Sequence, residues 1–380
     1  MQDSIDRRRA GRHDHDQHGR SATSPLDIRW RGWTQILKRT WTEIQEDRVL
    51  LVAAGAAFYV FLSIVPALSA LLSIYGLVFD PQSAREQAQV FLQWLPAEAQ
   101  SLIGEQMARL TGEAPTRLGT ALAVSLAISI WSASAATKAV IEGLNVVYDE
   151  QEKRSSIALY AVALAFTAGG LVLVVALVAV NIVLSSFIDQ WLGQAWAPRI
   201  LGAALVAFAA WIGLIAFYRW GPSRDEPQWR WLLIGSIAAI LLLAAASVLF
   251  SWYTRTFAAY SGYGSVGAVI GLLTWIWLSM AIVLAGAELN AETEHQTAMD
   301  TTVGAAEPMG GRGAHMADSV GGEAGGRPSE EGATVGTGRP APGLGRAPTR
   351  AAAWPPSPAE VGLVAAAALL GLAVQRLLSR

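Results

Sequence analysis

The chain has 380 residues, of which 53% are hydrophobic and only 15% are charged, and its formal net charge is −2. Soluble domains carry about 25% charged residues, so this deficit indicates a membrane protein. The sequence contains no cysteine, which excludes disulfides, thiolate metal sites and cysteine nucleophiles.

The N-terminal segment, residues 1–48, is polar and rich in arginine, and it lacks the apolar centre of a cleavable signal peptide. Positively charged residues are retained on the cytoplasmic side of membrane proteins, which places this segment in the cytoplasm. The five histidines all flank the apolar part of the chain. They are His13, His15, His18, His295 and His315.

Six apolar stretches follow, each near the roughly 20 residues that cross a hydrocarbon core of about 30 Å. They cover residues 49–78, 118–147, 157–188, 200–218, 231–253 and 266–289. The predicted fold class is therefore all-α: a polytopic transmembrane helical bundle within residues 49–294. Lys153, Arg154 and Arg224 lie in connections that an even span count returns to the cytoplasmic side.

Two further features concern the first span and the connection that follows it. Pro66 in the first span predicts a kink, with Ser63 available to cover the freed backbone group. Residues 80–117 have near-helical apolar spacing, which predicts two amphipathic helices separated at Pro96, where the second one begins. They are expected to cap the bundle or to lie in the headgroup layer.

The C-terminal part changes character. Residues 295–358 are rich in Gly, Pro and Ala, which predicts a disordered linker, so truncation after Ala298 is expected to leave the bundle folded. The last segment, residues 359–380, contains a short apolar stretch that fits either a seventh crossing or an interfacial helix.

Polar residues inside the spans are the candidates for function, because they are costly in lipid. Lys138 and Glu142 lie one helical turn apart, and Asn145 extends their stripe. Glu288 and Asn290 end the sixth span. These five residues are predicted to line a polar path or substrate site; the alternative is that they only fix the helix register or reach towards headgroups.

Other patterns have structural interpretations. Gly267 and Gly271 form a G-x-x-x-G pair, for which helix packing is the favoured reading. Asp149, Glu150 and Glu152 lie beside Lys153 and Arg154, which favours a solvated connection over a metal site. The sequence has no P-loop, nucleophile elbow or H-E-x-x-H motif, so no catalytic residue, metal ligand or cofactor is assigned.

Five segments in chain order resemble the YihY/BrkB family of bacterial inner-membrane proteins, and the resemblance covers about residues 41–294. The segments are 56–68, 131–134, 144–150, 263–270 and 286–292. The resemblance implies a six-helix inner-membrane protein of poorly defined activity. Members were historically mislabelled ribonuclease BN, and others are linked to serum resistance or to lipopolysaccharide and lipid handling.

The first functional hypothesis is a non-enzymatic transporter or flippase-like factor for an envelope lipid or other amphiphile. Its partners would be membrane lipids, including anionic or lipopolysaccharide-type amphiphiles, and no nucleic acid. A structural or scaffolding protein of the cell envelope is the alternative, and a membrane-associated nuclease or hydrolase is a weaker third. The substrate, the energy source and the oligomeric state are left open by the sequence.

Overall fold

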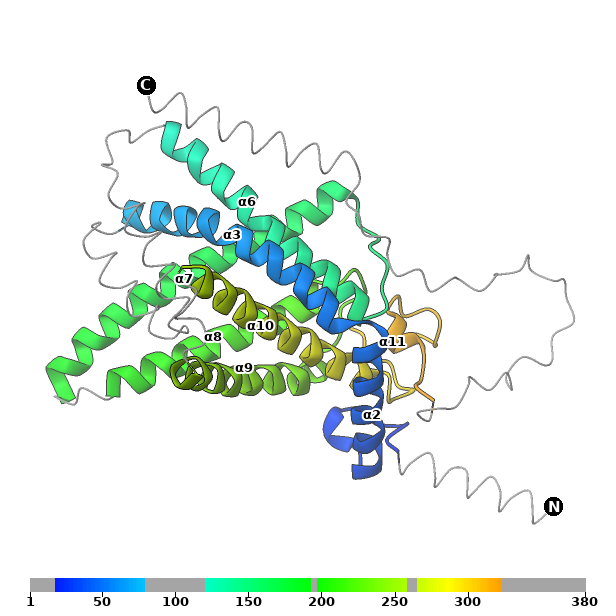
Figure 1. Cartoon of the computed structure of the whole chain (residues 1–380). Coiled ribbons are helices and arrows are strands. Elements are labelled where there is room, and N and C mark those ends of the chain that lie inside the picture. The colour runs from blue at the N-terminus through cyan, green and yellow to red at the C-terminus, as the bar shows by residue number, and fades with distance from the viewer. Residues whose placement is uncertain (1–17, 79–119, 193–196, 258–264, 323–380) are drawn as a thin grey trace, which may run out of the picture. The chain divides into compact units, whose positions relative to one another are not determined.

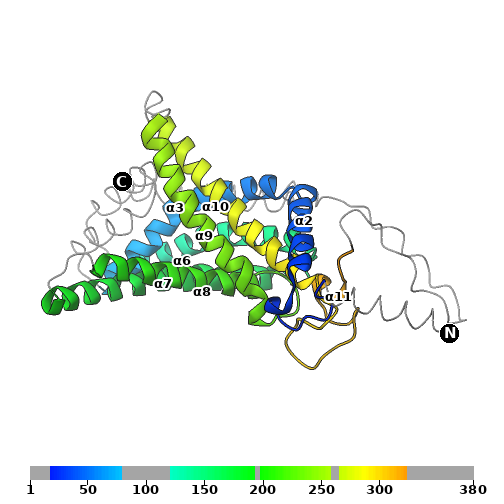
Figure 2. The ribbon, with the colours of Figure 1, turned by 90° about the horizontal axis from the view of Figure 1, so that it is seen from below.

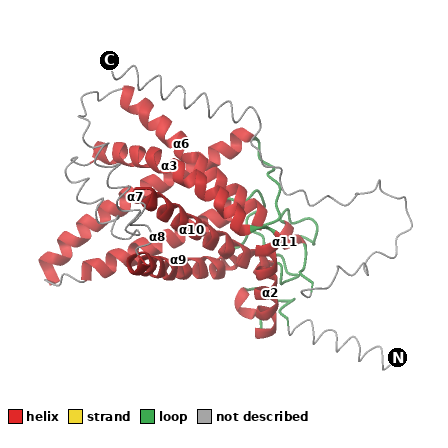
Figure 3. Cartoon of the chain, viewed as in Figure 1, coloured by secondary structure: helices red, strands yellow, loops and turns green. Residues whose placement is uncertain are grey.

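A computed structural model of the chain describes residues 18–78, 120–192, 197–257 and 265–322. All of them belong to the first of two compact units, Met1–Arg327. The secondary structure of the described residues is helical, joined by loops and without a β-strand (Figure 3).

The described helices follow the predicted spans closely. The 3₁₀ turn η1 (Pro25–Asp27) and α2 (Trp30–Glu46) come first. The long helices are α3 (Val49–Val78), α6 (Thr120–Val147), α7 (Ser156–Leu192), α8 (Ala197–Trp220), α9 (Trp229–Phe257) and α10 (Ser265–Glu294), and the short α11 (His315–Asp318) comes last.

The all-α fold class is confirmed. Helices α7, α8, α9 and α10 are each long and apolar enough to cross a membrane. Helix α3 joins α2 in a pair bent by 61°, which raises the number of candidate spans in the described residues to five. The total of six spans stays a prediction.

The helices pack around α10 and α3 (Figures 1 and 2). Helix α10 contacts α9, α3, α2 and α6, while α3 lies along α6. The main buried cluster lies where α6 ends and α3 begins, and it includes Val49, Leu144, Tyr218 and Leu284. Large apolar side chains elsewhere, such as Leu241 and Val248 of α9, face outwards, as expected for helices in lipid.

Helices α9 and α10 approach most closely at two glycines. A Cβ atom on Gly235 would lie 1.9 Å from the Gly286 carbonyl oxygen, and one on Gly286 would lie 2.7 Å from the Ala239 Cβ. Only a residue without a side chain fits such an approach. The predicted packing glycines, Gly267 and Gly271, are also buried in α10.

Pro66 lies inside α3, and its kink stays a prediction. Ser63 does not serve its own helix as expected: its hydroxyl donates to the Ser132 carbonyl of α6 at 3.4 Å. The reason is that α3 and α6 pack together, which brings an acceptor from another helix within reach.

The predicted disordered linker requires a correction at its start. Residues 299–321, which we name the C-terminal strap, are ordered and contribute Met316 to the main buried cluster. Composition alone failed here because the strap is stabilised by contacts with distant loops. The rest of the linker, the amphipathic helices predicted in 80–117 and the segment 359–380 lie outside the described residues.

Candidate functional site

Two of the predicted polar residues, Glu288 and Asn290, lie in the last turns of α10, and both side chains are buried. Asn290 accepts a hydrogen bond from the Gly235 backbone N–H at 2.7 Å, so its side chain fixes the contact between α9 and α10. Glu288 is fully buried, and neither of its carboxylate oxygens has a hydrogen-bond partner among the described residues. A buried carboxyl group without a partner is costly, and this makes Glu288 the main candidate for a functional role.

A buried ion pair that sequence analysis missed lies nearby. Arg224 donates from Nη2 to Glu294 Oε1 at 2.7 Å, and both side chains are 0% exposed. The guanidinium also lies 4.2 Å from the centre of the Tyr148 ring. Its Nε and Nη1 atoms have no hydrogen-bond partner among the described residues. The spacing of these residues in the sequence gave no signal for this contact, because it joins a loop to a helix 70 residues later.

Tyr148 brings these groups together into what we name the α10 polar cluster: Tyr148, Arg224, Glu288, Asn290 and Glu294. Burial raises the pKa of the Tyr148 hydroxyl; Arg224 and Asn290 lower it, while Glu294 and Glu288 raise it. The Arg224 guanidinium lies against the Tyr148 ring and pairs with Glu294, while Glu288 and Asn290 lie at the same buried end of α10. Among the described residues, neither the Tyr148 hydroxyl nor the Asn290 amide nitrogen has a hydrogen-bond partner.

Two carboxyl groups at the end of α2, those of Glu43 and of the capping residue Asp47, have raised pKa values. Burial, reinforced by Asp149 and Glu43, raises the pKa of Asp47 from 3.8 to about 7. Burial, reinforced by Glu292, raises the pKa of Glu43 to about 6. Glu292 has a cationic partner, since Arg39 forms a buried ion pair with it.

Replacing Asp47 with asparagine is expected to stabilise the protein clearly more at pH 8 than at pH 5. An unfolded aspartate loses its proton near pH 4, whereas folded Asp47 loses it at about 7. The raised pKa therefore costs stability as the pH rises between those values. The expected gain at pH 8 is about 1–2 kcal/mol after allowance for solvent screening of a partly exposed group.

Thermal unfolding of the detergent-solubilised protein at both pH values tests this expectation. Glu46→Gln is the matched control, because it removes an exposed carboxylate one residue away. Equal stabilisation by Asp47→Asn at pH 5 and pH 8 would contradict the assigned titration.

Asn145, also a predicted site residue, lies near the end of α6 and bonds to two loops. Its amide nitrogen donates to Glu152 at 2.9 Å, and its oxygen accepts from the Ser223 backbone N–H at 2.8 Å. Burial alone would raise the pKa of Glu152, but hydrogen bonds from Arg154 and Asn145 lower it to about 2. The acidic segment 149–152 is therefore bonded to its neighbours, while Asp149, Gln151 and Glu152 stay exposed in the predicted connection between α6 and α7.

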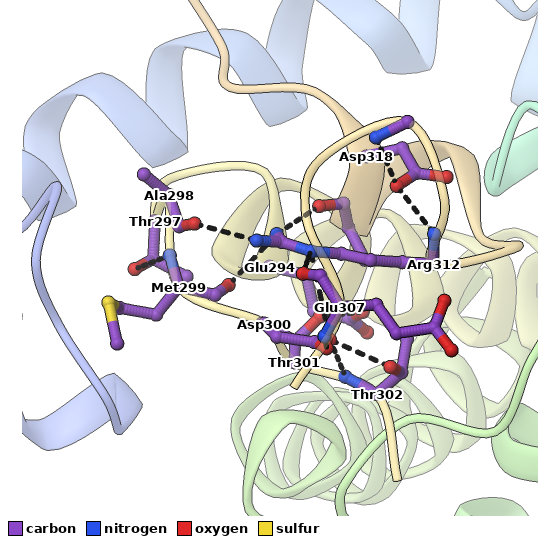
Figure 4. Close-up of polar contacts among 12 residues, drawn as sticks. Glu294, Thr297, Ala298, Met299, Asp300, Thr301, Thr302, Glu307, Arg312 and Asp318 are labelled. Atoms are coloured by element: carbon purple, nitrogen blue, oxygen red, sulfur yellow. Dashed lines mark hydrogen bonds and ion pairs between the residues drawn. The ribbon is translucent and has the colours of Figure 1, made fainter. Parts of the chain in front are cut away.

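The C-terminal strap forms polar contacts with itself and with the end of α10 (Figure 4). Arg312 is buried and donates to the carbonyl oxygens of Ala298, Met299 and Ala317. The Thr301 hydroxyl donates to Glu294 Oε2 at 3.2 Å, which connects the strap to the α10 polar cluster. Further along, the Asp225 N–H donates to the Gly313 carbonyl at 3.3 Å.

Lys138 and Glu142 occupy a different position, on the side of α6 that meets α7. Their charged atoms lie 3.6 Å apart, with side-chain exposures of 18% and 41%. The Lys138 ammonium lies 4.9 Å from the centre of the Tyr160 ring, and that ring stacks on Trp131. Of the five predicted residues, Glu288 and Asn290 are both buried at the end of α10, and the other three lie on α6. No group of metal-ligating side chains suited to a metal ion is found among the described residues.

Comparison with known proteins gives a consistent result. The family model described as virulence factor BrkB matches residues 40–309. YfkH of Bacillus subtilis strain 168, whose name calls it ribonuclease-like, is 29% identical over 256 residues, covering 63% of this chain and 88% of YfkH.

A UPF0761 membrane protein of Aliivibrio salmonicida is 28% identical over 259 residues, covering 65% of this chain and 79% of that protein. A UPF0761 membrane protein of Haemophilus influenzae is 23% identical over 257 residues, covering 66% of this chain and 91% of that protein. No solved structure matches the chain.

Proposed function

Because this chain belongs to the virulence factor BrkB family and is a multi-pass membrane protein, we propose that it is an inner-membrane transporter or flippase-like protein. Its substrate would be an envelope lipid or a similar amphiphile. The observation that carries the proposal is Glu288, a carboxyl group that is fully buried and unpartnered among the described residues. Such a group is retained in a membrane bundle chiefly at substrate and ion pathways.

The chemistry of the α10 polar cluster suggests the class of headgroup. Arg224 offers N–H donors at Nε and Nη1, while Glu288 offers acceptors, and these atoms have no hydrogen-bond partner within the described part of the chain. A phosphate or other anionic oxygen would complement the guanidinium. A hydroxyl or ammonium group on the same headgroup would complement the carboxylate. The proposed substrate is therefore an anionic or zwitterionic headgroup that also carries a hydrogen-bond donor.

Lys138 and Glu142 supply a second polar position in this proposal. Glu142 is 41% exposed on α6, and in a spanning helix an exposed side chain faces lipid or a neighbouring molecule. The Trp131 and Tyr160 rings lie beside the pair. A headgroup that moves along the side of α6 would meet opposite charges and aromatic rings there.

The proposed orientation has the N-terminus in the cytoplasm. Residues 1–48 are rich in arginine, which favours the cytoplasmic side. Gln296 donates to the His18 carbonyl at 2.7 Å, and the Ala298 N–H donates to the Arg20 carbonyl at 2.9 Å. The two flanks of the bundle therefore meet on one side, as an even number of crossings requires.

A scaffolding role is the second candidate. It is favoured by the polar ties among the loops and the strap, in which Asn145 and Arg312 are fully used in structural contacts. The only support for a nuclease or hydrolase role is the ribonuclease-like name of the Bacillus subtilis relative.

Glu288→Gln is expected to abolish substrate movement while leaving the protein folded. The substitution keeps the shape of the side chain but removes the charge that would bind a headgroup donor. Purified full-length protein would be placed in vesicles that contain phosphatidylglycerol or phosphatidylethanolamine with a fluorescent headgroup. Reduction of the label from outside then measures how much lipid has moved between leaflets.

Thr274→Val is the matched control, since it alters a hydroxyl of α10 that only bonds its own helix at Ile270. The proposal requires lipid movement with the wild type and the control and its loss with Glu288→Gln at unchanged monodispersity. No movement with the folded wild type in either lipid, or equal movement with Glu288→Gln, would favour the scaffold.

A further inference from the structure

Helix α2 presents three different faces along its 17 residues. One face is buried and contains Gly32, Ile36, Arg39 and Thr40; Gly32 lies against His18 and Ile28, while Arg39 contacts α10. The contact is fixed by the Arg39–Glu292 ion pair and by the hydrogen bond from Arg39 to Gln296 at 2.8 Å. These contacts fix the rotation of α2 about its own axis, so the other two faces must point away from α10.

The second face is apolar and fully outward. Trp30, Leu37 and Trp41 are 76%, 52% and 67% exposed. They are spaced by seven and four residues, so they share one stripe of the helix. Leu26, in the turn η1 just before α2, adds a fourth exposed apolar side chain. An exposed apolar stripe of this size is unfavourable in water, which indicates that another molecule or the membrane covers it.

The third face is polar and basic. Arg31 and Lys38 are both exposed, seven residues apart, and follow Trp30 and Leu37 directly in the sequence. The basic stripe therefore runs parallel to the apolar one. This pairing of aromatic residues with cations is typical of helices that lie in the headgroup layer of a membrane with anionic lipids.

The direction of α2 fits the same environment. It meets α3 at a bend of 61°, across a connection in which Arg48 has a φ of 51°. Figures 1 and 2 show α2 at the end of the bundle where α10 also ends, set across the direction of α3. This direction is compatible with a helix that lies along the membrane surface beside the first span.

We infer that α2 is an interfacial helix that binds anionic lipid headgroups: Trp30, Leu37 and Trp41 enter the bilayer boundary, and Arg31 and Lys38 contact the headgroups. The occupant of the exposed stripe is the surrounding membrane itself. The contact anchors the end of the bundle at the headgroup level and does not depend on whether the protein moves lipid.

The chain has no cysteine, so a single fluorophore can be placed at will. Leu37→Cys and the control Thr42→Cys, an exposed position on the polar face, would be labelled with an environment-sensitive probe in full-length protein in nanodiscs. We expect blue-shifted emission and quenching by acyl-brominated lipid for the probe at position 37 only. Quenching should be strongest with bromine close to the headgroup.

In mixed nanodiscs, brominated phosphatidylglycerol should quench the probe at position 37 more than brominated phosphatidylcholine at equal mole fraction. Arg31→Gln combined with Lys38→Gln, or high salt, should remove that preference. Water-like emission at both positions would overturn the inference. Blue-shifted emission without lipid quenching, together with a dimer in native mass spectrometry, would also overturn it, because a second copy would then cover the stripe. Strongest quenching by bromine at the ends of the acyl chains would overturn it as well, because α2 would then lie inside the hydrocarbon core.

Discussion

Replacing Arg224 with methionine is expected to destabilise the protein by about 3–5 kcal/mol, because it leaves the Glu294 carboxylate buried without its cation. Both side chains are 0% exposed, and their atoms lie 2.7 Å apart. Burial lowers the pKa of Arg224, but Glu294, Tyr148 and Glu150 together raise it above its usual value, so the guanidinium stays charged. Thr301 alone would still donate to the carboxylate, and one neutral hydroxyl does not replace a cation.

The double variant Arg224→Met with Glu294→Leu should be less damaging than the sum of the two single variants, since no charge is then stranded. Thermal unfolding of the four proteins in the same detergent measures this coupling. Arg230→Met is the matched control: Arg230 is exposed and bonds to Gln228, so a change within about 0.5 kcal/mol is expected. Additive effects of the single variants would show that the two residues do not form a buried pair.

Truncation after Ala298 should destabilise the protein strongly, whereas truncation after Gly322 should not. The shorter chain loses Met316 from the main buried cluster and all the carbonyl contacts of Arg312. Loss of one buried methionine side chain alone costs about 2–5 kcal/mol. The longer chain keeps every described contact of the strap. This expectation reverses the one drawn from composition.

The two truncations would be compared with the full-length chain by yield, monodispersity and melting temperature in detergent. Met316→Ala, measured in the full-length chain, separates packing by the strap from any effect of chain length. Equal melting temperatures for all three chain lengths would show that the strap does not stabilise the bundle.

The sequence alone determined the elements that the membrane imposes. A hydrocarbon core demands an apolar helix of fixed length, so the predicted span 49–78 coincides with α3, and the second span ends at Val147 as predicted. The family also followed from short motifs in order along the chain, and the family model confirmed it. The span prediction and the family prediction both depend on residues that are close together in the chain, and such patterns can be recognised without the structure.

Only the tertiary structure decided which polar residues are buried and which of them have partners. Glu288 and Asn290 are two residues apart, yet Asn290 meets the Gly235 N–H while Glu288 meets no described donor. That difference arises because α9 approaches α10 through Gly235 and Gly286, and no helical periodicity reports on a neighbouring helix.

The strap and the Arg224–Glu294 pair escaped prediction for the same reason. Arg312 and Met316 lie in a glycine-rich segment whose composition resembles a linker, but the strap is held by partners in other parts of the chain, such as Asp225. Hydrophobic length is a property of one segment and can be read locally. The satisfaction of a buried charge is a property of at least two segments, and only their packing brings them within hydrogen-bond distance.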